Sequence, residues 1–468
     1  MCIRDSRTTG HQRAALLVLL TASFTLAVDF SILNVALPAI GTDIGLGISH
    51  LQWIATVFAL CSAGFTLLMG RVADITGRRR TFLAGMILLG AGSLTGGLAT
   101  TPTILLAARA AQGLATATVV PAALALLIGT FTEGPARDKA LGLNGSLMAA
   151  GFTTGAILGG LLTDLLSWRW AFLINVPIAV AVLATAPIVL QESRAHERTR
   201  LDIPGALTAT LALLALVHGL THAAETTWTD PVTLAALAAA VVLLAVFVAV
   251  ERAVPVPLVP LRMLTRPSVA WGNVAGLLAF ATETSLVFLL TIYLQKVLGY
   301  TPLAAGLSFA VLGLGTVLGG LAGPKVIARF GSRTAIVGGF LLQAAATLPL
   351  VLISAAAGSI WLVLVATFAG GVANLVVIVG FMVTATADVP ASEHGLATGL
   401  TTMSQQVGIA LGTPVMSAVL TAVALGAAPG PGTTTVLDGV TAAIWVNGGA
   451  CVAAAAAVGI FLRRRARA

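Results

Sequence analysis

The stretch GRVADITGRRR, residues 70–80, places one aspartate and four arginines in eleven positions of a chain that is otherwise poor in charge. Of the 468 residues, 58% are hydrophobic and only 9% are charged, and the mean hydropathy is +1.01. A soluble domain carries roughly a quarter of charged residues. Most of this chain therefore does not face water, and we expect the charged stretch to be a turn at a membrane surface.

Apolar runs on both sides of this turn are long enough to cross a bilayer, which takes roughly 20 residues. Gly and Ala are abundant, as expected where helices pack closely in lipid. The sequence predicts an all-α integral membrane protein with fourteen transmembrane helices. The expected spans lie near 14–40, 51–69, 81–100, 103–128, 140–163, 170–190, 203–221, 232–250, 268–294, 303–324, 334–354, 359–386, 395–424 and 440–462.

The basic residues indicate the orientation of these spans. Over alternate loops, 22 of the 25 Lys and Arg residues lie on the side of the N-terminus. Arg169 and Lys296 lie on the other side, and Arg109 lies inside a span. Because basic loop residues are retained in the cytoplasm, we expect a multi-pass protein of the cell membrane with both termini cytoplasmic. The arginines of the turn are then partly an orientation signal.

Several other classes of protein are disfavoured. The net charge of +8 comes from arginines at span ends and not from clusters interleaved with exposed aromatics, so we expect no nucleic-acid partner. Cys2, Cys61 and Cys451 are too far apart for a disulfide framework or a metal site. The first apolar segment is long and lacks a small-residue cleavage site, so it is predicted to be a span and not a removed signal.

The charged turn has a counterpart later in the chain, GPKVIARFGSR at 323–333. An offset of 254 residues aligns Gly77 with Gly331 and Arg79 with Arg333, whereas Asp74 aligns with Ala328. Glycine-rich segments at 145–160 and 395–412 also correspond. Parallel halves of this kind are a transporter architecture with the substrate path between them. We expect a six-helix bundle in 1–190, two inserted helices in 191–267 and a second six-helix bundle in 268–468.

Five segments resemble, in order, motifs of the major facilitator superfamily, specifically its fourteen-span drug:proton antiporters. They are Gly70, Asp74, Gly77, Arg78 and Arg79 of the turn, DFSILNVALP (29–38), RAAQG (109–113) with Pro121, WRWAFLINVP (168–177) and LDIPGAL (201–207). The resemblance implies the major facilitator fold and export of amphipathic drugs or antibiotics by proton antiport with alternating access. The expected partners are a small organic substrate, protons and membrane lipid, with no cofactor and a monomer as the working unit.

Two positions depart from the family pattern. The antiporter motif reads GAILGG at 155–160, with Ala156 in place of the usual proline, and Phe58 stands where the family often has tyrosine. Export of a dedicated metabolite and proton symport by the same fold therefore remain as alternatives.

Ionisable residues at span depth are candidates for proton coupling, because an aspartate at mid-span costs roughly 2.5–3.5 kcal/mol. Asp29 and Glu283 each lie about eleven residues, or roughly 16 Å, from the outer end of the first span of a half. Arg109 lies about eight residues, or roughly 12 Å, below the outer end of its span. We expect Asp29 and Arg109 to pair, and Glu283 to occupy the position related to Asp29 by the repeat.

Polar and aromatic groups on other spans are candidates for the wall of a cavity for amphipathic ligands. They are Asn34, Trp53, Gln112, Asn374 and Gln405, followed by Gln406. His218, in an inserted span, is predicted to be structural, and Asp388 and Glu393 are predicted to lie in a cytoplasmic loop.

Two glycine patterns suggest moving parts. Gly70 and Gly77 frame the charges of the turn, so an Asp74–arginine pair there is a candidate latch of the cytoplasmic gate. Gly151, Gly155 and Gly159 recur every four residues and therefore share one helix face. We expect close helix packing along that face, either static or as a sliding contact between the two halves.

An integral-membrane enzyme and a channel are the alternative classes. The chain has no HExxH motif, no spacing typical of a Ser/His/Asp set and no Walker motif. It also lacks the repeated pore-lining charges or filter sequence of a channel. We therefore expect a transporter and not an enzyme.

Overall fold

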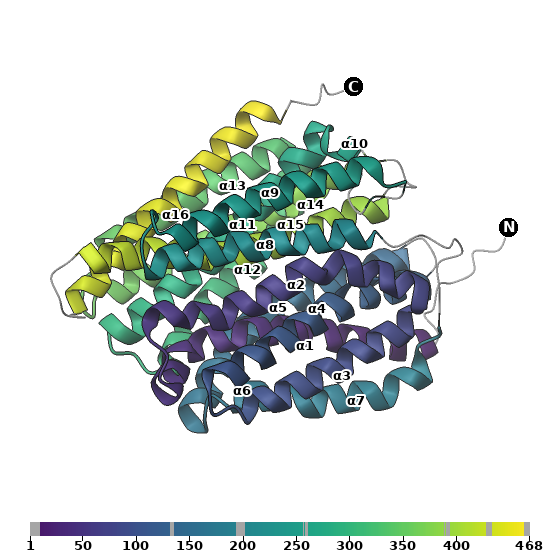
Figure 1. The fold of residues 1–468 in the computed structure, drawn as a ribbon, viewed down its shortest axis with the longest axis horizontal. Coiled ribbons are helices and arrows are strands. Elements are labelled where there is room, and N and C mark those ends of the chain that lie inside the picture. Colours follow the sequence, from purple (N-terminus) through teal and green to yellow (C-terminus); the bar gives the residue numbers. More distant parts are fainter. Residues whose placement is uncertain are drawn as a thin grey trace.

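The computed structural model describes residues 10–131, 135–192, 202–255, 257, 261–387, 389, 394–426 and 433–462, and over these residues the chain is helical with no strand (Figure 1). The first part comprises α1 (Gly10–Ile44), α2 (Ile48–Thr76), α3 (Arg78–Gly97), α4 (Pro102–Thr130), α5 (Pro135–Leu165), α6 (Trp170–Leu173) and α7 (Asn175–Val189). Then come α8 (Ile203–Glu225), α9 (Pro231–Ala253) and the short α10 (Leu261–Leu264). The last part comprises α11 (Pro267–Ile292), a π-helical turn η1 (Tyr293–Val297), α12 (Pro302–Phe330), α13 (Ser332–Thr347), a 3-10 turn η2 (Leu348–Leu352), α14 (Ser359–Ala387), α15 (His394–Gly426) and α16 (Thr433–Phe461).

Eleven helices of the described chain are long and apolar enough to cross a membrane, with α6 and α7 counted as one. A twelfth is α2, if its two parts, His50–Thr66 and Leu68–Thr76, form one span bent by 51°. The other two expected spans coincide with α3, which begins with three arginines and contains five glycines, and with α5. The chain is thus a multi-span helical membrane protein with eleven or twelve candidate spans, where the sequence predicts fourteen.

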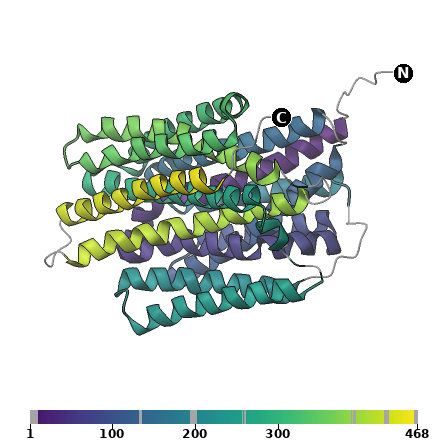
Figure 2. The ribbon, with the colours of Figure 1, turned by 90° about the horizontal axis from the view of Figure 1, so that it is seen from above.

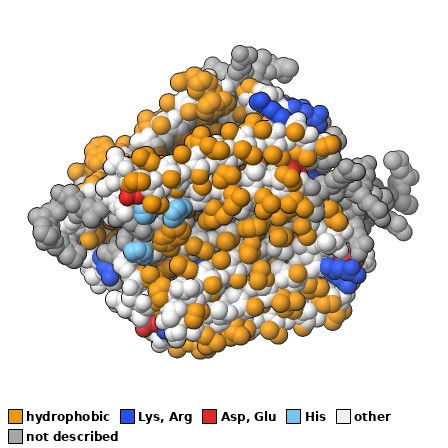
Figure 3. Space-filling view, viewed as in Figure 1, with side chains coloured by type: hydrophobic (Ala, Val, Ile, Leu, Met, Phe, Trp, Pro, Cys, Tyr) orange, Lys and Arg blue, Asp and Glu red, His pale blue; other side chains and the backbone are white. Residues whose placement is uncertain are grey.

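The helices form two bundles with a helix pair beside them. Helices α1 to α7 pack on one another, as do α11 to α16, whereas α8 packs against α2 and α15 and α9 packs on α8. Figure 2 shows α8 and α9 at the edge of the molecule. The start of α1 and the end of α16 point toward the same end of the molecule (Figure 1), which we call the basic end. Lys and Arg side chains gather there, whereas His side chains lie toward the far end (Figure 3).

The internal repeat is visible in the backbone. Among the described residues, positive φ occurs at Gly45 (79°), Gly77 (116°), Gly299 (68°) and Gly331 (82°), and these form two pairs 254 residues apart. Gly77 and Gly331 each end one helix and begin the next, a conformation that costs glycine little. The offset found in the sequence is therefore a structural repeat.

The arginines after these two glycines also make equivalent contacts. Arg79 donates to the carbonyl oxygens of Pro187 and Leu190 at the end of α7, and Arg333 donates to that of Gly459 near the end of α16. Cations are favourable at helix C-termini, where carbonyl groups lack intrahelical partners. Arg79 therefore connects the α2–α3 hairpin to α7, and Arg333 connects the α12–α13 hairpin to α16.

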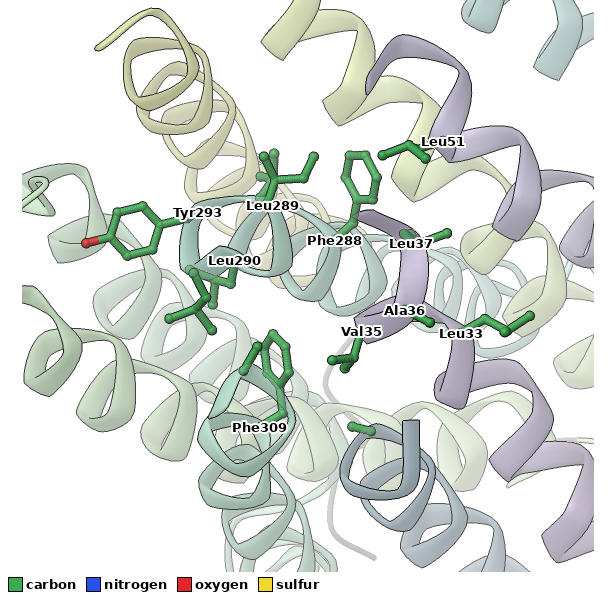
Figure 4. Packing of buried hydrophobic residues seen from close by; sticks show 14 of the residues in the cluster. Leu33, Val35, Ala36, Leu37, Leu51, Phe288, Leu289, Leu290, Tyr293 and Phe309 are labelled. Carbon is green, nitrogen blue, oxygen red and sulfur yellow. The ribbon is translucent and has the colours of Figure 1, made fainter. Parts of the chain in front are cut away.

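An apolar cluster joins the two bundles at the far end. Figure 4 shows Leu37 of α1 and Leu51 of α2 beside Phe288 of α11, and Val35 of α1 on the side of Phe309 of α12. The same buried cluster includes Leu33, Ala36, Leu289 and Leu290. Beside it, Gln295 Nε2 donates to the carbonyl oxygen of Val35 over 2.7 Å. The bundles are therefore closed against each other at this end.

The second contact between the bundles is made by α5 and α12. A Cβ added to Gly160 would lie 2.5 Å from the carbonyl oxygen of Pro302. A Cβ added to Gly306 would lie 2.6 Å from the carbonyl oxygen of Ala156. A Cβ added to Gly313 would lie 2.0 Å from Thr153 Cγ2. Only glycine permits so close an approach of two backbones.

The glycine face of α5 packs closely, as predicted, but its partner is α1 of the same bundle. Cβ atoms added to Gly155 and Gly159 would lie 1.9 Å from Ser31 Oγ and 2.0 Å from the carbonyl oxygen of Ile32, and one on Gly151 would lie 2.7 Å from Ala27 Cβ. The proposed sliding contact between halves along this face is therefore wrong. The helical period places 151, 155 and 159 away from the face of α5 that meets α12.

Candidate functional site

Asp29 lies at the centre of a polar cluster inside the first bundle. Its side chain is fully buried, as is that of Arg109, and Arg109 Nη1 lies 3.4 Å from Asp29 Oδ2. Gln112 Nε2 and Asn175 Nδ2 donate to Asp29 Oδ1 over 2.8 and 2.5 Å. One carboxylate therefore accepts hydrogen bonds from α4 and α7 while belonging to α1, and the predicted Asp29–Arg109 pair is confirmed.

Arg109 has further partners that hold its guanidinium group in place. Its Nε donates to the carbonyl oxygen of Ile54 in α2 over 2.9 Å, and its Nη1 donates to Gln112 Oε1 over 2.9 Å. The guanidinium carbon lies 4.2 Å from the centre of the Phe58 ring, a cation–π contact. Removing one partner of a buried pair leaves an uncompensated charge, which costs about 3–5 kcal/mol. Loss of the Asp29 charge would therefore leave the buried Arg109 without its ion-pair partner.

Three members of this cluster were not predicted as site residues. Ser93 of α3 accepts from Gln112 Nε2 over 2.9 Å and from Asn175 Nδ2 over 3.3 Å. Asn175 lies in the WRWAFLINVP stretch, which was the available signal, and Phe58 was noted only as a departure from the family pattern. Nothing in the sequence distinguishes Ser93 from other serines in spans.

The first two residues of the WRWAFLINVP stretch make their contacts at the far end of the first bundle and not in the Asp29 cluster. Trp168 Nε1 and Arg169 Nη1 both donate to Asp43 Oδ2, over 3.0 and 2.7 Å. Arg169 also lies 4.3 Å from the Trp168 ring. These contacts tie the end of α1 to α6 and thereby support the position from which Asn175 reaches Asp29.

The prediction that Gln112 lines a substrate cavity is wrong. Its side chain is fully buried, and both its amide nitrogen and its carbonyl oxygen are used in the Asp29 cluster. Its position three residues after Arg109 puts the two side chains on the same face of α4, which points into the bundle.

Glu283 lies at the related position of the second bundle and has a different environment. It is half-buried, and within the described chain its carboxylate has no hydrogen-bond or ion-pair partner. It lines a small cavity with Gln343, Thr367, Asn374 and apolar residues of α11 and α12. The water-accessible volume is about 20 Å³, room for roughly one water molecule.

The polar groups around this cavity are joined to one another. Asn374 Nδ2 donates to the carbonyl oxygen of Ala279 over 3.0 Å, and Gln343 Nε2 donates to Thr282 Oγ1 over 3.1 Å. Asn374 Oδ1 is buried without a partner. Asn374 therefore lines a cavity, but one that lies within the second bundle and holds about one water molecule, so its predicted place in a substrate cavity stays a prediction.

The remaining predicted cavity residues are dispersed. Asn34 of α1 and Gln405 of α15 are half-buried. Trp53 faces the inserted helix α8, with its ring centre 6.4 Å from that of His218. Gln406, which follows Gln405 in the sequence, forms a hydrogen bond with Ser62 of α2 and so links the two bundles.

His218 lies beside a second histidine at the far end of α8, and its structural role stays a prediction. Its ring stacks on that of His222 at 5.9 Å, and His222 Nε2 lies 3.1 Å from Asp230 Oδ1. Backbone N–H groups at the start of α9, first that of Val232, hold the pKa of Asp230 below its usual value. No group of three or more His, Cys, Asp and Glu suited to a metal occurs among the described residues.

The turn at 70–80 contains the predicted aspartate–arginine pair. Arg78 Nε and Nη2 donate to Asp74 Oδ1 over 3.1 and 3.0 Å, with the two side chains 24% and 28% exposed. Gly70 lies against Pro121 of α4. The pair joins α2 to α3 within the first bundle. Asp388 and Glu393 lie outside the described residues.

Fold and site together define a helical membrane protein of two related bundles, an architecture typical of transporters. A family model described as Major Facilitator Superfamily matches residues 19–413. The chain belongs to the Major Facilitator Superfamily.

Its relatives include proteins named for antibiotic export or resistance. The chain is 37% identical over 427 residues to the cephamycin export protein CmcT of Amycolatopsis lactamdurans, covering 88% of this chain and 85% of that protein. It is 37% identical over 411 residues to the puromycin resistance protein pur8 of Streptomyces alboniger, covering 87% and 81%. It is 32% identical over 416 residues to the tetracenomycin C resistance and export protein of Streptomyces glaucescens, covering 88% and 76%.

Solved structures with the same fold are more distant in sequence. The human organic anion transporter MFSD10 (TETRAN) matches with a TM-score of 0.62 at 16% identity, covering 96% of this chain and 99% of that one. A bacterial homolog of the human lysosomal transporter Spinster, in an inward-facing and unoccupied conformation, matches with a TM-score of 0.66 at 17% identity, covering 99% and 100%. These likenesses establish the fold.

Proposed function

We propose that this chain exports amphipathic organic molecules, antibiotics among them, across the cell membrane in exchange for protons. The names of its relatives support the class of substrate, since three of them are exporters or resistance proteins for antibiotics. The observation that carries the proton part is the fully buried Asp29–Arg109 pair, in which a titratable group on α1 accepts hydrogen bonds from α4 and α7 of the same bundle.

The proposed topology has fourteen spans, with α3 and α5 completing the candidate set and the basic end in the cytoplasm. The described arginines and lysines support this orientation, because basic residues near span ends are retained in the cytoplasm. In this topology 1–190 and 268–468 act as two moving bundles, 191–267 adds α8 and α9, and a single chain is the working unit.

The proposed cycle alternates access to a path between the bundles. The contacts of α1 and α2 with α11, and of α5 with α12, close the far end, which in this orientation faces outward. Asn34 and Gln405 are the proposed wall of the substrate path. The Asp74–Arg78 turn stiffens the cytoplasmic gate by holding α2 and α3 together.

Asp29 and Glu283 have separate proposed roles. Asp29 carries the proton, because its loss of charge frees Arg109 to change partners. Glu283, whose carboxylate has no partner in the described chain, lies in a cavity too small for a substrate, so its proposed role is to favour cationic substrates in a state of the cycle that opens this cavity to the substrate path.

The test is efflux from proteoliposomes with an imposed pH gradient, using one cationic and one neutral drug. Export that follows the gradient and stops when a protonophore collapses it supports the proposal. Uptake in the direction of proton flow would instead establish symport, the alternative that Ala156 suggests. Transport confined to one compound of a broad panel would establish a dedicated metabolite exporter.

A further inference from the structure

A groove lies between α2 and α3 near the basic end, with α4 behind it. It is lined by Met69 and Val72 of α2, by Ala84 and Leu88 of α3 and by Thr118 of α4, and its volume is about 360 Å³. Helices α2 and α3 each pack extensively on α4 and only slightly on each other. The 51° bend of α2 lies just before Met69, where the groove begins.

The groove has an apolar interior and a cation at its mouth. Arg80 lines it and has a side chain that is 69% exposed. Its two neighbours are already engaged, Arg78 with Asp74 and Arg79 with the end of α7. Arg80 Nε lies 3.8 Å from Glu192 Oε2, a long contact between side chains that are 69% and 26% exposed, and such partly exposed pairs bind weakly. The charge of Arg80 is therefore available to an anion.

The dimensions of the groove match the bilayer around it. From Arg80 to Leu88, α3 runs eight residues, or about 12 Å, whereas half of the hydrocarbon core measures about 15 Å. A groove of 360 Å³ has room for on the order of ten water-sized groups. With the basic end placed at the membrane surface, the groove would begin at the level of lipid headgroups and continue among the acyl chains.

We propose that this groove binds a membrane phospholipid, with one acyl chain between α2 and α3 and the phosphate on Arg80. The apolar lining suits the acyl chain, and the exposed guanidinium suits the phosphate, which arginine binds with paired N–H donors. A lipid in this place would keep α2 and α3 apart just beside the Asp74–Arg78 turn. The proposal does not depend on drug export.

The experiment is photo-crosslinking in proteoliposomes that contain phosphatidylglycerol with a diazirine near the middle of one acyl chain. The full-length protein is irradiated, digested and mapped by mass spectrometry. We expect adducts concentrated between residues 69 and 88. Adducts spread evenly over all lipid-facing helices would overturn the proposal, because they would indicate ordinary surrounding lipid.

Two matched pairs of variants locate the binding. Ala84→Phe fills the groove and is expected to reduce labelling at least fivefold, whereas Ala91→Phe, at another exposed alanine of the same helix outside the groove, should not. Arg80→Gln should reduce labelling and Arg80→Lys should restore part of it, whereas Arg252→Gln, at an exposed arginine of α9, should have no effect. Equal labelling within each pair would overturn the proposal.

Two further controls keep the result decisive. Circular dichroism and the thermal midpoint in detergent show whether each variant folds, and Arg80→Gln at its exposed position provides the test if Ala84→Phe does not fold. Displacement of the label by excess puromycin, with no recovery at higher lipid content, would show that the groove belongs to an amphipathic drug and would overturn its assignment to lipid.

Discussion

The approach of Gly306 to Ala156 allows the balance between open and closed states to be shifted by one methyl group. A Cβ at position 306 would lie 2.6 Å from the carbonyl oxygen of Ala156, whereas ordinary contacts begin at 3.4 Å. The oxygen belongs to the backbone of α5 and cannot rotate away. In Gly306→Ala, α5 and α12 must therefore separate by several tenths of an ångström wherever they now touch.

The expected cost falls only on the state in which the far end is closed. Overpacking by one methyl group costs about 1–3 kcal/mol, and 1.4 kcal/mol corresponds to a factor of ten. Gly306→Ala should therefore shift the equilibrium toward the state open at the far end by roughly 5- to 150-fold. The open state needs no such contact, so the protein should remain folded.

The assay is the rate at which a membrane-impermeant maleimide labels Asn34→Cys from the outside, in a chain whose natural cysteines are replaced. Gly159→Ala is the matched control, because its Cβ would lie 2.0 Å from the carbonyl oxygen of Ile32 within one bundle. It should lower thermal stability without faster labelling. Unchanged labelling in Gly306→Ala, or an equal rise in the control, would refute the reasoning.

Three further outcomes test the polar residues. Asp29→Asn should abolish gradient-driven export and keep some passive substrate exchange. It should also lower the thermal midpoint, since an unpaired buried Arg109 costs about 3–5 kcal/mol. Full gradient-driven export would show that Asp29 is structural. Glu283→Gln should weaken export of a cationic drug and spare a neutral one, measured as initial rates; equal loss of both would contradict its role in charge selection. Asp74→Asn should insert normally, as immunoblots of membranes would show. It should slow export by at most about fivefold, because partly exposed pairs contribute about 0–1 kcal/mol. An unchanged export rate would show that the turn has no role in the gate.

Much of the Asp29 cluster could be predicted because depth along a span follows from counting residues. The distances of Asp29 and Arg109 from their span ends were enough to predict a pair, which the structure confirms at 3.4 Å. The rotation of a helix is harder to infer in an apolar span, where no polar face marks the direction of the core. Gln112 was therefore assigned to a cavity wall, and Ser93 was overlooked.

The glycines show the same limit. Their spacing on α5 predicted close packing, and Gly151, Gly155 and Gly159 do lie against a neighbouring backbone. Spacing does not name the neighbour, which is α1 and not the second bundle. Similarly, the sequence repeat places Glu283 opposite Asp29 but does not show that one acid is paired and the other has no partner in the described chain.

The sequence by itself determined that the chain is a helical membrane protein, where most of its candidate spans lie and that its two halves are related. Those properties depend on local hydropathy and on an offset of 254 residues. Only the tertiary structure decided which helices share the Asp29 cluster, which face of α5 meets α12 and that a groove separates α2 from α3. These depend on how helices far apart in the chain rotate and pack, and side-chain volumes across several helices settle that packing together.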